Sequence, residues 1–170
     1  MIYNGKFKVT SPFGRRVLNG QQGDHKGIDV VGLGDKHVCA VVSGTVAAST
    51  MILDKSDRTW EWGNYVRVDG VDGRRYYYCH LSKRLVKVGD HLGIEGNTGY
   101  SFGSHCHFEV RENGVSINPA PFLGIPNKAG TYGTDWRAEV QKKFGLSKDT
   151  MTYLDKYKYA ADLYMKLGKA

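Results

Sequence analysis

The sequence predicts a mainly β protein, in which an antiparallel β-sheet domain precedes a small C-terminal helical appendage. The 170 residues include 22 glycines and four prolines, a composition typical of short strands joined by tight turns. The pair Asn113-Gly114, set between two apolar runs, is a strong signal of a two-residue hairpin loop. Beyond residue 125 the apolar period changes from that of a strand to that of a helix. We therefore place the strand domain at residues 1–125 and the helical appendage at residues 126–170.

Composition and charge bound the function. With 41% hydrophobic residues the chain can build one main core. Its net charge of +7 suits any polyanionic partner, including nucleic acid and a bacterial wall that carries teichoic acid. The chain has no dense run of Lys and Arg, which argues against nucleic acid. A salt-dependent DNA-binding assay separates these classes, because absence of binding at low salt excludes a nucleic-acid-binding β domain.

The cysteines and the chain start bear on the compartment. Cys39, Cys79 and Cys106 are odd in number and irregularly spaced, so we predict no disulfide framework and interpret them as small buried hydrophobes. Residues 1–6 lack the pattern of a signal peptide, and the sequence has no run of about 18 apolar residues. We expect no membrane insertion and find no export signal in this chain.

Strand and turn signals follow one another through the first domain. We expect a strand that runs into a turn, a polar loop, two strands divided at a glycine, and a charged insertion that carries tryptophans. The strand and its turn lie at residues 9–16, and the polar loop lies at residues 19–24. The two strands lie at residues 38–48, divided at Gly44, and the charged insertion lies at residues 52–63.

A tyrosine-rich hairpin follows at residues 64–70 and 74–81. Alternation in its second arm places Tyr76, Tyr78 and His80 on one face, and Cys79 with Tyr77 on the other. Two interpretations stay open for the tyrosines. They line a groove that leads to His80, or they form an ordinary tyrosine-rich sheet surface.

The tail predicts two helices. The first spans residues 135–144, with Thr134 as its cap and Gly145 after its end. The second spans residues 150–167, with Leu154, Tyr157, Ala161 and Tyr164 on one apolar stripe. We expect this tail to pack on the strand domain.

Two histidines two residues apart mark the central stretch of the chain, residues 104–110. In a strand, His105 and His107 point to one face while Cys106 and Phe108 point to the core. An isolated His-x-His pair is more often an ordinary pair of strand residues. Further candidates upstream turn this pair into a possible metal-site constellation.

Those upstream candidates are His25, Asp29 and His80. A spacing of four places His25 and Asp29 on one face of a helix, and an even spacing also places them on one face of a strand. Gly27 and the β-branched residues nearby favour the strand. The shared polar face then needs a partner, which a metal ion supplies.

Catalytic zinc takes three protein ligands and keeps one open position. His25, Asp29 and one histidine of the 105/107 pair fill these three places. The two remaining histidines then stand beside the metal. The residues alone do not assign the two roles within the 105/107 pair.

The order of these motifs resembles the lysostaphin-type, LytM-like zinc endopeptidases of peptidase family M23, over about residues 9–121. The resemblance covers residues 10–16, 25–29, 42–46, 63–66, 79–82, 96–99 and 105–111, and ends at Asn118-Pro119. It implies an antiparallel β fold with a single zinc ion held in a groove by His25, Asp29 and His107. It also implies that His80 and His105 are the catalytic pair.

The activity that the resemblance implies is hydrolysis of peptide bonds in the stem or cross-link of bacterial peptidoglycan. Action at the bacterial wall without an export signal leads to the hypothesis of a phage lysin or virion-associated enzyme, or of one domain of a longer secreted or tail protein. The alternative is a non-catalytic LytM-like module that activates another wall hydrolase. Such modules generally lack zinc ligands, whereas none of the five matched polar positions is missing here.

The chain departs from the family pattern in two places. Cysteines stand at positions 79 and 106 beside the catalytic histidines, and we expect both to point away from the site. The segment 88–99 is shorter than the usual pattern by about one turn and strand, which alters one groove wall. His37 and His91 match no ligand position and are interpreted as surface residues.

Overall fold

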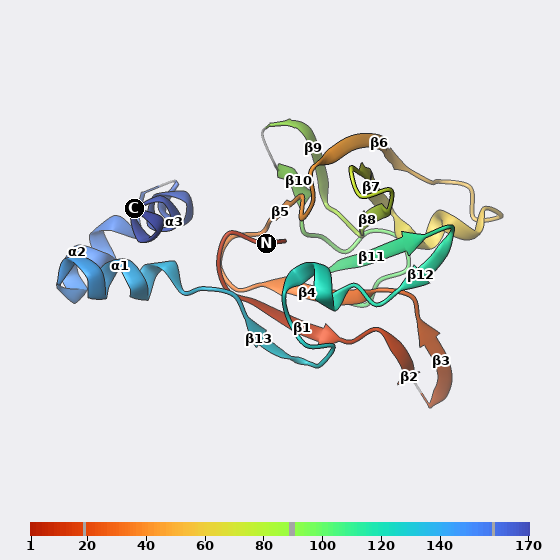
Figure 1. The fold of residues 1–170 in the computed structure, drawn as a ribbon, viewed down its shortest axis with the longest axis horizontal. Coiled ribbons are helices and arrows are strands. Elements are labelled where there is room, and N and C mark those ends of the chain that lie inside the picture. Colours follow the sequence, from red (N-terminus) through yellow and green to blue (C-terminus); the bar gives the residue numbers. More distant parts are fainter. Residues whose placement is uncertain (19, 89–90, 158) are drawn as a thin grey trace.

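The computed structural model describes residues 1–18, 20–88, 91–157 and 159–170 (Figure 1). Within them the strands are β1 (Phe7–Ser11), β2 (Gly14–Leu18), β3 (Gln21–His25), β4 (Ile28–Gly32), β5 (His37–Cys39), β6 (Gly44–Met51), β7 (Asn64–Gly70), β8 (Arg75–Cys79), β9 (Lys83–Val88), β10 (His91–Ile94), β11 (Cys106–Glu112), β12 (Val115–Ile117) and β13 (Gly130–Tyr132). The helices are η1 (Arg58–Trp62), η2 (Ala120–Leu123), α1 (Trp136–Phe144), α2 (Lys148–Leu154) and α3 (Ala160–Lys169).

The main sheet is antiparallel and confirms the predicted fold class. Its order is β13-β1-β4-β11-β8-β7-β6, and β12 pairs with β11. Strand β11 therefore lies between β4 and β8, which brings the His-x-His stretch beside the strand that carries Asp29 (Figure 1). The predicted turn is also confirmed: Asn113 and Gly114 both have positive φ, as a two-residue hairpin loop requires.

The tyrosine hairpin forms as β7–β8, but its tyrosines do not line a groove. Tyr76 and Tyr78 are 1% and 0% exposed and stack against Phe108 in the core. Direct cross-strand pairing of Tyr78 with Phe108 places both on the apolar face of the sheet. Both earlier interpretations, groove wall and sheet surface, are therefore wrong for these two residues.

The segment predicted as a polar loop is instead part of a two-stranded ribbon. Strands β2 and β3 pair antiparallel from Gly14↔His25 to Leu18↔Gln21. Most β3 residues are exposed, so hydrophobic alternation gave no signal. Residue 19 lies outside the described residues. A third sheet, β5-β10-β9, contains the stacked rings of His37 and His91, whose centroids are 4.9 Å apart.

The helical tail differs from the prediction at two points. The cap of α1 is Asp135 rather than Thr134, because the Asp135 carboxylate accepts a hydrogen bond from the backbone N–H of Ala138. The expected second helix is divided into α2 and α3. The division lets Met151 of α2 and Tyr164 of α3 both pack on Val140 of α1, which one straight helix does not allow.

Residues 154–164 therefore do not form one apolar stripe. Tyr157 lies between the two helices and is 55% exposed, whereas Tyr164 is 4% exposed. The Tyr164 hydroxyl donates a hydrogen bond to Asp155, which also pairs with Arg137 and fixes the turn between α2 and α3. None of the helices within the described residues has the length and apolarity of a membrane span.

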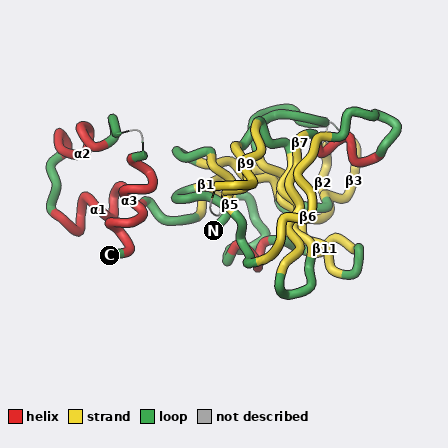
Figure 2. The backbone as a smooth tube through the Cα atoms, turned by 90° about the horizontal axis from the view of Figure 1, so that it is seen from above, coloured by secondary structure: helices red, strands yellow, loops and turns green. Residues whose placement is uncertain are grey.

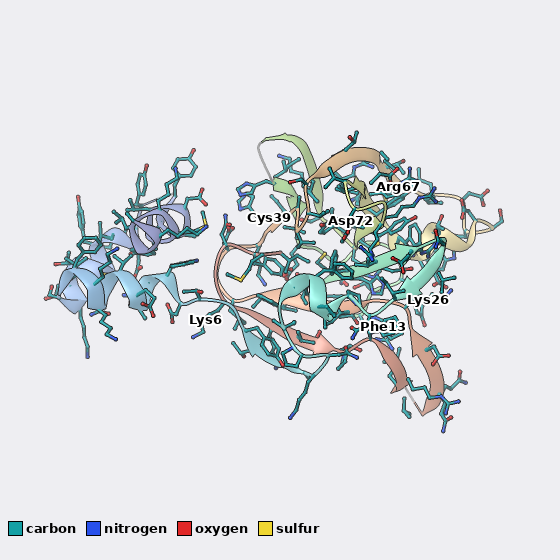
Figure 3. All side chains as sticks on the ribbon, viewed as in Figure 1. Lys6, Phe13, Lys26, Cys39, Arg67 and Asp72 are labelled. Carbon is teal, nitrogen blue, oxygen red and sulfur yellow. The ribbon has the colours of Figure 1, made fainter. Side chains whose placement is uncertain are left out.

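The three helices have an apolar core of their own, separate from that of the strand domain. Figures 1 and 2 show them standing to one side of the sheets. Their polar links to the strand domain lie near the N-terminus. Lys6, labelled in Figure 3, pairs with Asp135 at 3.2 Å, and Asn4 donates to Asp162 at 3.1 Å.

The strands continue beyond residue 125. Strand β13 pairs with β1, and Tyr132 packs against Phe7. Asn127 exchanges two hydrogen bonds with the backbone of Phe13. We therefore propose that the boundary between the two parts lies near Gly133, where the sheet ends and the helical core begins, rather than at residue 125.

Candidate metal centre and catalytic groove

Three side chains converge at the centre of the main sheet. His25 ends β3, Asp29 lies on β4 and His107 lies on β11, directly paired with Asp29. The distances are 3.1 Å from His25 Nε2 to Asp29 Oδ1, 2.9 Å from His107 Nδ1 to the same oxygen, and 3.0 Å between the two nitrogens. The earlier interpretation of His25 and Asp29 on one strand is wrong, because Gly27 turns the chain between two strands.

Gly27 is required at this turn by the approach of His107. A Cβ added at Gly27 meets the imidazole of His107 at 2.6 Å and the carbonyl oxygen of Phe108 at the same distance. Any other residue forces the ring of His107 or the backbone of Phe108 to move. Strand β11 can pass this close to the turn because glycine has no side chain.

Acceptors at fixed positions orient the two rings differently. His25 Nδ1 lies 2.8 Å from the carbonyl oxygen of Pro12, which only accepts, so Nδ1 carries the proton and Nε2 presents its lone pair to the centre. In His107 the two ring nitrogens have the opposite roles, so that Nδ1 faces the centre. Its Nε2 faces Glu109 at 3.6 Å, and its Nδ1 faces Asp29.

Glu109 is a site residue that the sequence analysis missed. It is 1% exposed and accepts hydrogen bonds from Arg111 and Ser116, each at 2.6 Å. Burial raises the pKa of Glu109, but hydrogen bonds with His107, Arg111 and Ser116 outweigh this effect and lower the pKa to about 2. Its position two residues after His107 on one strand face was the available signal.

The charges of the centre are strongly coupled. Burial alone raises the pKa of Asp29, yet its contacts with the imidazoles of His107 and His25 hold that pKa well below the ordinary value. Burial lowers the pKa of His107, and the carboxylates of Asp29 and Glu109 outweigh burial and raise the pKa to about 9. Arg16 contacts the outer oxygen of Asp29 at 3.2 Å.

The donor set fits a zinc ion. Two imidazole nitrogens and a carboxylate oxygen, all within 4.8 Å of one another, are borderline and hard donors that zinc accepts. Tetrahedral zinc with bonds of about 2.0–2.1 Å places its donors about 3.3 Å apart, close to the separations here. The Glu109–His107 contact is of the type that orients metal-binding histidines.

Two further histidines face this centre. The rings of His80 and His105 are 4.7 Å apart, and His105 Nε2 lies 3.6 Å from Asp29 Oδ1. His105 donates from Nδ1 to the carbonyl of Gly103, and His80 donates from Nδ1 to the carbonyl of Thr98, both at 2.8 Å. Each ring therefore keeps its Nε2 lone pair for a reactant.

His80 arrives by a backbone feature that alternation does not predict. It has a φ of 64° and follows the last residue of β8, so it does not share a face with Tyr76 and Tyr78. Its pKa is lowered to about 4 by burial and by the neighbouring His107 and His105. The imidazole is accordingly neutral and able to accept a proton at neutral pH.

The cysteines occupy different faces. Cys106 is buried in the apolar core, as expected. Cys79 is the direct cross-strand partner of His107, so it lies on the face of the metal centre, and the expectation that it points away is wrong. Burial raises the pKa of the Cys79 thiol well above its ordinary value. The cysteine is thus a small neutral packing residue, and none of the three cysteines, all of which lie within the described residues, forms a disulfide.

A groove of about 520 Å³ opens above the centre. One rim carries Val17 and Leu18 of β2, and the other carries Tyr100 and Phe102, which are 53% and 70% exposed. Tyr100 contacts both Phe102 and Trp60 edge to face. The sequence analysis foresaw neither rim. Residues 89 and 90 of the shortened segment lie outside the described residues.

A larger cavity, of about 650 Å³, lies between the N-terminal segment and the helices. Its charged residues already have partners, with Lys6 on Asp135 and Arg137 on Asp155. The titratable side chains with shifted pKa values gather instead in the smaller groove, so we place the chemistry there.

Comparison with known proteins agrees with this geometry. The model of the family "Peptidase family M23" matches residues 23–119. Glycyl-glycine endopeptidase ALE-1 of Staphylococcus capitis is 34% identical over 140 residues, which are 76% of this chain and 36% of that protein. Peptidoglycan DD-endopeptidase ShyC of Vibrio cholerae is 33% identical over 121 residues, 66% of this chain and 26% of that protein.

The fold has solved counterparts. The catalytic domain of the antimicrobial peptidase lysostaphin from Staphylococcus simulans superposes with a TM-score of 0.51 at 32% identity, over 70% of this chain and 91% of that domain. The chain spans a quarter to about a third of the length of the first curated relatives that it matches.

Proposed function

Because the chain belongs to peptidase family M23, we propose that it is a zinc-dependent endopeptidase that hydrolyses peptide bonds in the stem or cross-link of bacterial peptidoglycan, with one zinc ion per chain. The observation that carries the proposal is the convergence of His25, Asp29 and His107 with two more imidazoles on the same side of the groove. A non-catalytic module has no need for five such side chains at one point.

We assign the metal to His25, Asp29 and His107, and the proton transfers to His105 and His80. Zinc, when bound, lowers the pKa of water and polarises the scissile carbonyl. His105 Nε2 is placed to accept the proton that the attacking water gives up as its oxygen adds to the carbonyl carbon. The C–N bond then breaks, and the leaving amine takes a proton from an imidazole.

His80 completes this arrangement, with its ring 4.7 Å from the ring of His105. Its neutral ring, held by the Thr98 carbonyl, presents Nε2 toward the same space as His105. The imidazole that has accepted the water proton gives it to the nitrogen of the leaving amine, so the proton taken up in the first step is released in the second. The products are a new carboxylate and a new amine.

The substrate class follows from the groove and from the relatives. The groove is lined by exposed apolar side chains, Val17 and Leu18 from β2 and Tyr100 and Phe102 from the segment before β11, and these suit contact with a peptide chain. The relatives are named for two different bonds, a glycyl-glycine bond and a DD bond. We propose that this chain acts, like them, at the bacterial wall, outside the cytoplasm or delivered by a phage particle.

The test is digestion of purified peptidoglycans with two cross-link chemistries, one with glycine bridges and one with direct D-amino-acid links. The zinc-loaded protein is expected to release new amino termini, which mass spectrometry assigns to one bond. The His107→Ala variant serves as the inactive control. Release of reducing sugar ends without new amino termini contradicts the proposal.

A further inference from the structure

Glu95 is a buried carboxylate that lies outside the ligand set. It follows β10, and its side chain is 0% exposed. Its two oxygens each accept two hydrogen bonds, at 2.7 to 2.8 Å, from residues of four separate segments. Lys36 Nζ and Ser104 Oγ donate to Oε1, and the Tyr3 hydroxyl and the Gly32 backbone N–H donate to Oε2.

Such a group is costly unless every acceptor site is filled. Burial alone raises the pKa of Glu95, but the donors Lys36, Gly32, Tyr3 and Ser104 outweigh burial and hold the pKa below its ordinary value. The carboxylate is therefore charged at neutral pH. An apolar side chain fills a buried position at lower cost, so the network calls for an explanation beyond packing.

One of the four donors, Ser104, is next to a residue that lines the groove. Ser104 immediately precedes His105, and the Ser104 residue is itself exposed, so its hydroxyl turns inward to meet Glu95. The next residue along, Gly96, accepts a hydrogen bond from the backbone N–H of His105 at 2.9 Å. Glu95 and Gly96 together hold both residues that lead into β11.

The opposite side of the carboxylate is anchored on rigid structure. Gly32 ends β4, three residues after Asp29, and Tyr3 is buried and also contacts the carbonyl of Val30. Glu95 thus connects β4, the strand that carries Asp29, with Ser104 and His105, the two residues that lead into β11. His105 Nε2 lies 3.6 Å from Asp29 Oδ1, and this connection through Glu95 helps to hold the two residues at that distance.

We propose that Glu95 is a positioning residue for His105 and acts through the hydroxyl of Ser104. The inference rests on the proposed role of His105 in proton transfer. It assigns Glu95 no contact with substrate or metal. Misplacement of a proton-transfer group by about 1 Å costs on the order of 10²-fold in rate, so a small relaxation of residues 104 and 105 is measurable.

The test compares two variants that each remove one donor from the same carboxylate. Ser104→Ala removes one of two donors on Oε1, on the side of His105. Tyr3→Phe removes one of two donors on Oε2, on the side remote from the groove. Ser104→Thr keeps the hydroxyl and is the rescue variant. All are measured as zinc-loaded full-length protein on soluble peptidoglycan fragments, with zinc content and melting temperature.

We expect Ser104→Ala to lower kcat about 10-fold with KM and zinc content unchanged. Ser104→Thr restores kcat, and Tyr3→Phe lowers the melting temperature but changes kcat less than twofold. Equal kcat in Ser104→Ala and wild type overturns the proposal. Equal losses of kcat in Ser104→Ala and Tyr3→Phe also overturn it, because they indicate a general structural role.

A second readout does not depend on turnover. Long-range proton–nitrogen NMR correlations at one fixed pH report whether His105 carries its proton on Nδ1, as its bond to Gly103 requires. We expect one tautomer in wild type and Tyr3→Phe, and a mixture of tautomers in Ser104→Ala. An inactive wild type refutes the proposed function, whereas an unchanged His105 spectrum in Ser104→Ala refutes the positioning role.

Discussion

Nδ1 of His107 lies 3.0 Å from Nε2 of His25, although the two rings come from strands far apart in the sequence. The proton of His25 is committed to Pro12, so the nitrogen that faces His107 offers a lone pair. Both nitrogens also lie within 3.1 Å of one Asp29 oxygen. Three electron-rich atoms at this separation require a cation between them, either a proton or a metal ion.

The first prediction follows from that relationship. His107→Ala removes one of three donors, so both zinc binding and turnover are expected to be lost. Metal analysis of the purified variant checks the first and fragment cleavage checks the second. His37→Ala, a change on the separate β5-β10-β9 sheet, is the control and should retain about one zinc. Full zinc in His107→Ala removes this residue from the ligand set.

A second prediction separates ligands from proton-transfer groups. His105→Ala and His80→Ala are expected to keep close to one zinc per chain while turnover falls by about 10²-fold, the usual scale for positioned acid–base groups. Zinc content and kcat are measured on the same preparations. If His105→Ala empties the site while His107→Ala keeps its metal, the two roles are reversed. Equal zinc loss from both indicates that the strand supplies two ligands.

The third prediction concerns Glu109. Its contact with His107 Nε2 favours the orientation in which Nδ1 faces the metal, so Glu109→Gln should weaken zinc binding about 10- to 100-fold. Competition with a fluorescent chelator measures this change. Glu112→Gln, three residues later on an exposed end of the same strand, is the matched control. Equal affinity in the two variants contradicts the orienting role.

Truncation tests where the strand domain ends. A chain that stops at Gly133 keeps β13 and the contact of Tyr132 with Phe7, so it should fold, hold zinc and cleave soluble fragments. A chain that stops at Gly124 loses both, together with the hydrogen bonds of Asn127, and should melt at a lower temperature. Precipitation of the longer version shows instead that the helices are needed for folding.

Glu95 gives the pH prediction. Its folded pKa is lowered from the ordinary value of 4.5, so its ionised form stabilises the fold above that pH, and the stabilisation is lost as the pH falls through the lowered folded value. Glu95→Gln should therefore reduce the free energy of unfolding by about 2 kcal/mol at pH 7. Urea denaturation should show the difference shrinking as the pH falls below 4.5. A constant difference down to pH 3 contradicts this account.

The sequence predicted the parts of the site that depend on strand alternation and motif order. His105 and His107 do share a face, because both rings approach Asp29. The mainly antiparallel fold and the Asn113-Gly114 hairpin also followed from local patterns, because turn chemistry acts within a few residues.

The failures arise where tertiary pairing or backbone conformation decides. The positive φ of His80 removes it from the alternation of β8, and the pairing of Cys79 with His107 cannot be read from one strand. Exposed β3 has no apolar period, yet pairing with β2 makes it a strand. The second predicted helix is divided because Met151 and Tyr164 both pack on Val140, and this contact between helices cannot be read from the apolar period.

The most direct test is a zinc titration of the metal-free protein, with release of amines from peptidoglycan followed at each addition. The account predicts no cleavage without metal, a linear rise, and a break at about one zinc per chain, since the site has one set of three ligands. Cleavage that persists in protein shown by analysis to be free of metal would contradict the zinc mechanism.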